Sequence, residues 1–219
     1  LMKKIKNIFK NKVTRNASWM IIGRIYQMSL SFVVSMLTAR YLGPSNYGLV
    51  NYASSFTSFF STFCVLGINS VIVKNFIDHP NEGKTTGSAI GVRMISSICS
   101  VVLIMVATLF LDRGERTTHL VVLLLGLGAI PQVFDTLNYW FQAKLESKYA
   151  AIASAIGYTV MMGYKISLLV FQKNVVWFAA ASSIEYLVVA VCLYYNYRRH
   201  GGPSLSFSWR KVKELLNSS

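Results

Sequence analysis

The sequence is short of charged side chains, and of acidic ones above all. Only 14% of its 219 residues are charged and only eight are Asp or Glu, whereas 53% are hydrophobic. A soluble domain of ordinary composition carries about 25% charged residues. Together with long apolar runs and a mean hydropathy of +0.45, this deficit excludes an ordinary soluble domain and favours a polytopic membrane protein.

Residues that build metal, redox or hydrolytic sites are also scarce. The three cysteines, Cys64, Cys99 and Cys192, lie in apolar stretches, and no pair has a metal-ligand or redox spacing. We interpret them as small packing residues. The three histidines stand far apart, and no paired-carboxylate or Ser–His–Asp pattern is present. The sequence therefore predicts no metal, no other cofactor and no enzymatic activity.

A complete nucleotide-binding loop is missing too. The run EGKTT at residues 82–86 matches the end of such a loop, but the pattern requires a glycine five residues before Gly83, where Asp78 stands. We therefore expect no ATP binding.

What the chain does have is apolar runs long enough to cross a bilayer, which takes about 20 helical residues. Six such runs are predicted, at Trp19–Leu42, Tyr47–Ile72, Ser88–Leu111, His119–Phe141, Tyr149–Phe171 and Val175–Tyr197. The expected fold is an all-α bundle of six transmembrane helices over residues 19–197. A basic amphipathic arm (1–18) would precede it, and a basic tail (198–219) would follow.

The positive charge follows the membrane topology. Most of the 22 Lys and Arg residues lie in the arm, the second and fourth connections and the tail, and few lie in the other connections. By the positive-inside rule, both termini are expected in the cytoplasm. A formal charge of +14 could by itself suggest a nucleic-acid partner, but this distribution argues against one.

Polar side chains recur inside the predicted spans. In the first span, steps of three and four place them on one helix face, at Arg24, Gln27, Ser31, Ser35 and Thr38. Such a row is costly against lipid, so it is expected to face the bundle interior or a water-filled cavity. The other spans carry similar residues, at Asn51, Arg93, Asp135, Asn138, Gln142, Ser154, Tyr158, Lys165 and Glu185.

Three of the ionisable residues are predicted to share one layer of the membrane. Arg24 and Arg93 each lie about five residues from the cytoplasmic start of their helices, and Asp135 lies about six from the cytoplasmic end of its helix. They could form a cationic site for phosphate, with Asp135 ordering the arginines. The alternative is that each arginine snorkels to the inner interface.

Two further features leave alternatives open. Lys165 and Glu185 lie at depths that differ by about 6 Å on consecutive helices, which suits either a structural ion pair or proton or ion coupling through Glu185. Pro131 lacks an amide hydrogen and should loosen the fourth span, as a static kink or as a bending point.

The junction of the first two spans, TARYLGPSNYGLVNYA at residues 38–53, resembles that of bacterial polysaccharide exporters. These are the O-antigen (Wzx-like) lipid-linked oligosaccharide flippases of the multidrug/oligosaccharidyl-lipid/polysaccharide superfamily. Here Gly43 and Pro44 forbid continued helix and predict a tight turn, after which Ser45 or Asn46 can cap the second helix. Weaker similarities occur at residues 66–70, 73–74, 79–80, 93, 142–144, 148–149 and around 185.

The resemblance implies two six-helix lobes around a central cavity in the bacterial cytoplasmic (inner) membrane. This chain would be the N-terminal lobe, and a complete cavity would need the missing C-terminal lobe or a second copy. The implied function is flipping of a polyprenyl-diphosphate-linked oligosaccharide by alternating access. Arg24 and Arg93 would hold diphosphate or acidic sugar, and Gln27, Asn51 and Asn138 would bond sugar hydroxyls.

Three other interpretations remain open at this point. A cation-coupled multidrug exporter would rely on Asp135 and Glu185. A membrane enzyme of glycan assembly would need an acidic catalytic loop, which the short connections do not supply. A non-transporting membrane scaffold would require the half-length chain to be natural.

Overall fold

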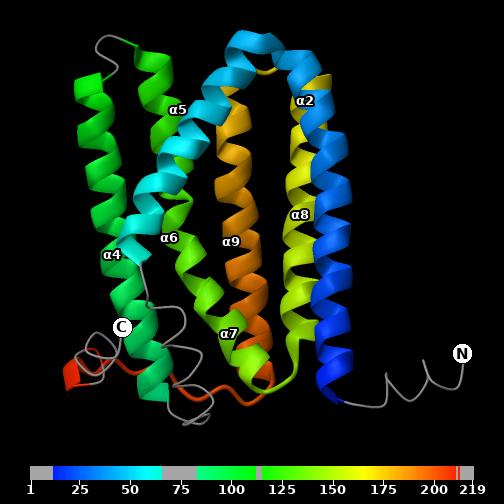
Figure 1. The fold of residues 1–219 in the computed structure, drawn as a ribbon, viewed down its shortest axis with the longest axis vertical. Helices are drawn as coiled ribbons and strands as arrows, with labels where there is room; N and C mark the ends of the chain where they lie inside the picture. Colours follow the sequence, from blue (N-terminus) through cyan, green and yellow to red (C-terminus); the bar gives the residue numbers. More distant parts are fainter. Residues whose placement is uncertain (1–11, 66–82, 112–114, 211, 213–219) are drawn as a thin grey trace, which may run out of the picture.

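The computed structural model describes residues 12–65, 83–111, 115–210 and 212, without the side chains of residues 63–65. All regular structure in these ranges is helical (Figure 1). The elements are α2 (Lys12–Val65), α4 (Gly83–Leu111), α5 (Arg116–Leu127), α6 (Ala129–Gln132), the 3-10 turn η1 (Val133–Asp135), α7 (Thr136–Ala143), α8 (Ser147–Val170) and α9 (Val175–Arg199).

Helix α2 contains both of the first two predicted spans and is bent between them. The bend lies at Gly43, whose φ of 69° and ψ of 174° are not helical. The positive φ suits glycine alone, and Pro44 disfavours the α conformation at the residue before it. The predicted turn is therefore confirmed. It divides α2 into a first arm (residues 12–42) and a second arm (residues 44–65), which run in opposite directions along the bundle (Figure 1).

The side chain of Asn46 acts differently from the expected cap. Its amide nitrogen donates a hydrogen bond to the carbonyl oxygen of Leu42, at 3.3 Å. A helix leaves its last carbonyl groups without intrahelical partners, so Asn46 stabilises the end of the first arm from across the bend.

The fourth predicted span is interrupted, as Pro131 predicts. The helix breaks at Gly128 and passes through α6 and η1 before α7 continues it. Proline cannot donate to the carbonyl four residues earlier, which here belongs to Leu127, the last residue of α5. The Ser183 hydroxyl of α9 donates to the carbonyl of Leu124 just before the break. The structure shows the interruption in one conformation, and its use as a bending point stays a prediction.

Helix α8 lies between the first arm of α2 and α9 (Figure 1). On one side, Gly23 packs against Ala151, and Tyr26 shares a 2.9 Å hydroxyl hydrogen bond with Thr159. On the other side, any side chain at Gly157 would overlap Val189. Small residues at such contacts let membrane helices approach closely.

Two apolar clusters hold the opposite ends of the bundle. At the end where α7 joins α8, Trp140, Phe141 and Tyr197 are fully buried, and the rings of Trp140 and Tyr197 lie 4.8 Å apart. At the end where α2 bends, Leu42 and Phe178 belong to the second cluster. Both clusters join residues far apart in sequence.

Five helices in the described ranges are long and apolar enough to cross a membrane: α2 up to Thr62, α4, the run from Arg116 to Ala143, α8 and α9. The predicted all-α polytopic bundle is confirmed at this level. The first two predicted spans share one helix, so the count of six stays a prediction, and residues 66–72 of the second lie outside the described part. Residues 12–18 of the expected arm continue into α2.

Candidate functional site

Four of the five residues in the polar row of the first arm line two adjoining cavities, whereas Thr38 is buried and lines neither of them. The first cavity, of about 230 Å³, includes Arg24 and Gln27 from α2, Asn138 and Gln142 from α7, and Ser154 from α8. The second cavity, of about 380 Å³, is lined by Arg24, Gln27, Met28, Ser31, Phe32, Ser35 and Tyr158. Because the two cavities share Arg24 and Gln27, they form one groove along α2, which we call the α2 groove. It extends from Met20 to Ser35, about 22 Å at 1.5 Å per residue.

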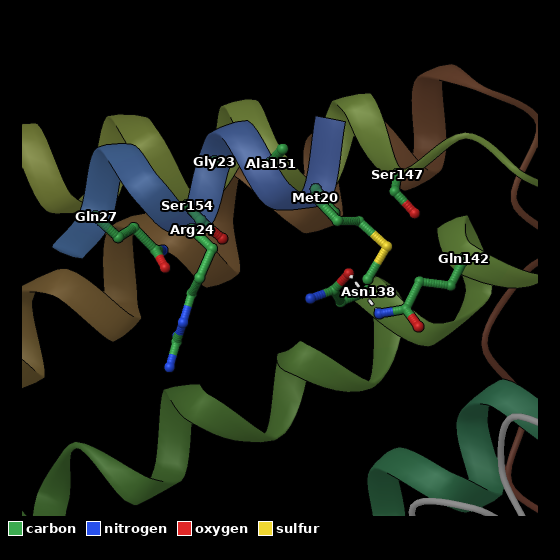
Figure 2. A pocket seen from close by; sticks show the side chains of 10 residues that line it. Met20, Gly23, Arg24, Gln27, Asn138, Gln142, Ser147, Ala151 and Ser154 are labelled. Carbon is green, nitrogen blue, oxygen red and sulfur yellow. Dashed lines mark hydrogen bonds between the residues drawn. The ribbon is translucent and has the colours of Figure 1, made fainter. Parts of the chain in front are cut away.

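Figure 2 shows how side chains meet in the first cavity. Arg24 and Gln27 extend from α2 into the space in front of α7, and Arg24 is exposed there. On the α7 side of the cavity, the side-chain amide nitrogen of Gln142 donates to the side-chain oxygen Oδ1 of Asn138, at 3.3 Å. The groove thus offers one guanidinium group, three amides and hydroxyl groups. These groups bind anions and hydroxyl-rich ligands.

Arg93 lies in a different place from Arg24. It is buried on α4, with 9% of its surface exposed, and donates to the Thr136 hydroxyl of α7 at 3.2 Å. With Gln132 and Ser97 it lines a third, much smaller cavity of about 20 Å³. The two arginines that were predicted to share one site therefore line separate cavities.

Asp135 lies in η1, at the interruption of the fourth span. The positive charge of Arg93 acts on its carboxyl group, and both Asp135 and Arg24 act on the phenol of Tyr158. Asp135 is therefore within electrostatic range of Arg93, although Arg24 and Arg93 line different cavities.

Lys165 and Glu185 interact electrostatically across α8 and α9. The charge of Asp135 also acts on Glu185. The choice between a structural ion pair and ion coupling stays open. Asn51 is exposed on the second arm of α2 and lines none of the three cavities.

Ser147 and Asn16 were not singled out by the sequence patterns. Ser147 is almost fully buried and borders the first cavity at the start of α8. Its backbone amide donates to the Asn16 side-chain oxygen at 2.6 Å. This bond joins α2 to α8 across 131 residues, and no local periodicity signals such a contact. Gln142, Ser154 and Tyr158 did carry a signal, because they belong to the polar seams of their helices.

No group of three His, Cys, Asp or Glu residues in the described ranges is placed to hold a metal ion. The α2 groove offers hydrogen-bonding groups and one guanidinium group, which suit binding of a polar solute.

Comparison with known proteins identifies the family. A family model described as "Polysaccharide biosynthesis protein" matches residues 13–219. No curated protein and no solved structure matches the chain. The match covers nearly all of the chain and agrees with the resemblance carried by residues 38–53. The chain belongs to the polysaccharide biosynthesis protein family.

Proposed function

We propose that this chain is one lobe of a transporter that flips a polyprenyl-diphosphate-linked oligosaccharide across the bacterial cytoplasmic membrane. Membership of the polysaccharide biosynthesis family supports a role in polysaccharide transport. The observation that carries the specific proposal is the α2 groove, in which two cavities share the exposed Arg24. The cargo would pass from the inner to the outer leaflet.

The chemistry of the groove fits the two polar parts of this cargo. Arginine binds phosphate with two parallel hydrogen bonds, so Arg24 is the contact for the diphosphate. Gln27 and Asn138 are amides in the same cavity, which can both donate to and accept from sugar hydroxyls. Met28 and Phe32 line the second cavity and suit the start of the lipid chain.

The groove is open on one side, since Arg24 is exposed. A second lobe or a second copy of the chain would face this opening and complete the cavity. Rocking of the two bodies would then expose the groove to each leaflet in turn.

The proposed topology counts the two arms of α2 as separate crossings, which gives six. The end of the bundle where α2 begins and α9 ends is rich in cations: Lys12, Arg15, Lys84, Lys144, Lys148, Arg198 and Arg199. The opposite end has Arg40, Arg116 and Lys173. The positive-inside rule then places the first end, and both termini, in the cytoplasm.

Arg93 and Asp135 have a supporting role in this proposal. Arg93 is held on Thr136 and interacts with Asp135, so together they order the interrupted helix that carries Asn138. Asn51 on the second arm would meet the cargo only after the two bodies move.

A cation-coupled multidrug exporter is the second candidate. The electrostatic interaction of Glu185 with Asp135 favours it, because two neighbouring carboxylates can bind a coupling cation. This candidate predicts drug efflux that depends on Glu185, with no requirement for Arg24.

The test is complementation of a flippase-deficient bacterium with the wild-type protein, Arg24→Ala and the control Arg40→Ala. Arg40 is an exposed arginine of the same arm and lines neither cavity of the groove. We expect surface glycan with the wild type and the control, and a loss of about tenfold or more with Arg24→Ala. Full restoration by Arg24→Ala at equal membrane levels would reject the proposed site, and a drug-efflux assay would then test the exporter.

A further inference from the structure

The segment that follows α9 is bound to the side of α4. After α9 the chain turns at Gly201, with a φ of 74°, and the Tyr197 hydroxyl donates to the Pro203 carbonyl at 2.8 Å. The segment then crosses from the base of α9 to the base of α4 (Figure 1). We call residues 203–208 the strap.

Three glycines of α4 form the surface on which the strap lies. Gly83, Gly87 and Gly91 are spaced by four residues and therefore share one helix face. A Cβ at Gly83 would overlap the carbonyl of Ser204, and one at Gly87 would overlap the backbone of Ser206. One at Gly91 would lie 2.7 Å from the Phe207 ring. The strap therefore follows α4 for about 12 Å, or two helical turns.

Hydrogen bonds fix the strap to this face. The Ser206 amide donates to the Gly83 carbonyl at 3.2 Å. The buried Ser88 hydroxyl accepts from the Ser208 amide at 3.0 Å and donates to the Ser208 carbonyl at 3.2 Å. Backbone groups that are paired in this way can lie next to lipid at little cost.

The strap and the two residues that follow it, Trp209 and Arg210, expose aromatic and basic side chains. Phe207 is 49% exposed and Trp209 is 66% exposed, and their rings pack edge to face at 5.4 Å. The ends of the segments that the strap joins carry exposed cations, with Arg198 and Arg199 at the end of α9, Lys84 at the start of α4 and Arg210 just after the strap. Residues 83–111 and 186–213 contain no Asp or Glu, and the acidic residues closest in sequence to Lys84 and Arg210 are Glu82 and Glu214, so the cations outnumber the acids in and next to these segments.

We propose that the strap is a preformed anchor for acidic phospholipid headgroups at the membrane interface. Trp and other aromatic residues favour the headgroup level, and each Lys or Arg close to an anionic surface adds about 1 kcal/mol of attraction. The glycine face of α4 sets the position of the anchor before lipid binds. This inference concerns the lipid contacts of the lobe and does not depend on the cargo.

The test uses the whole chain reconstituted into mixed vesicles of phosphatidylglycerol and phosphatidylcholine in equal amounts, in which either the phosphatidylglycerol or the phosphatidylcholine is brominated. Fluorescence of Trp209 is obtained as the difference from the Trp209→Phe variant, so that the other tryptophans cancel. We expect Trp209 to be quenched several-fold more strongly when phosphatidylglycerol is the brominated lipid. Absence of quenching in both lipids would mean that water or protein covers the strap, and equal quenching would exclude selection for acidic lipid. Either result overturns the proposal.

One variant tests the contact of the strap with α4, and another tests the positive charge beside it. Gly87→Ala should displace the strap and abolish the preference for phosphatidylglycerol. The control Gly163→Ala should keep the preference, because a Cβ at Gly163 meets nothing within 4 Å. If Gly87→Ala does not fold, a substitution of the exposed Arg210 provides the test. Arg210→Gln should weaken quenching by brominated phosphatidylglycerol alone. An unchanged preference in the double variant Arg199→Gln/Arg210→Gln would reject the role of charge.

Discussion

Arg24 and Arg93 make the most instructive comparison in this molecule. Both are arginines in the early part of an apolar helix, and both were predicted to lie in one layer. Arg24 is exposed in the α2 groove, whereas Arg93 is buried on α4 and hydrogen-bonded to Thr136. The difference shows that neighbours, more than residue type or depth, decide whether a membrane arginine is available to a ligand.

The largest expected effect is on stability, at Arg93. The substitution Arg93→Met removes the buried hydrogen bond to Thr136 and the positive charge that acts on Asp135, and loss of a hydrogen bond to a charged group costs about 1.5–3 kcal/mol. We expect a strong loss of folded protein, measured by thermal unfolding in detergent. The matched substitution Arg24→Met should change the free energy of unfolding by about 0.5 kcal/mol or less. Equal costs at the two positions would contradict the contrast between them.

The next effect is on transport, at Arg24. The variant Arg24→Lys keeps the charge but loses the two-pronged geometry that suits phosphate, so we expect partial flipping. Arg24→Gln removes the charge and should reduce flipping about tenfold or more. The measurement is the amount of surface glycan at matched membrane levels. If both variants transported like the wild type, the groove arginine would not contact the cargo.

A smaller effect on stability is expected from substitutions in α8, which packs closely against α9 beside the α2 groove. At Gly157 an alanine would overlap Val189, and overpacking of this kind costs about 1–3 kcal/mol. Gly163 lies on the same helix in open space, where alanine should stabilise by about 0.5–1 kcal/mol. Thermal unfolding of Gly157→Ala and Gly163→Ala should therefore shift in opposite directions. Shifts of the same sign would argue against the close contact of α8 and α9.

An effect of similar size is expected at the bend of α2. Gly43→Ala forces a residue with a Cβ into a positive φ with an extended ψ, at a cost of about 1–3 kcal/mol. Gly48→Ala is the control, since it lies in open space in the second arm. A lower melting temperature for Gly43→Ala alone is expected. No difference between the two would mean that the bend tolerates other conformations.

Much of the fold was predictable because its causes are local. Apolar run length predicted the long apolar helices, and the stereochemistry of Gly43–Pro44 and Pro131 predicted the bend and the interrupted helix. The helical spacing of Arg24, Gln27, Ser31 and Ser35 also predicted the groove face.

The remainder of the candidate site depends on how helices rotate about their own axes. Depth along a helix can be counted from the sequence, but rotation is set by packing against other helices, so the separation of Arg24 from Arg93 could not be foreseen. Packing between distant segments also determines two other contacts. These are the hydrogen bond between Asn16 and Ser147 and the contact of the strap with Gly87. Each joins segments more than 100 residues apart, and neither leaves a periodic signal.

Cross-linking inside the α2 groove tests the central claim most directly. A photo-reactive amino acid would replace Gln27, which lines both cavities, or Val33, which is 51% exposed on the same arm and lines neither. In cells that make lipid-linked oligosaccharide, we expect the oligosaccharide lipid to be captured at position 27 and not at position 33. Capture at position 27 should also be lost with Arg24→Ala. Equal capture at both positions, or capture that does not depend on Arg24, would contradict a cargo site in the α2 groove.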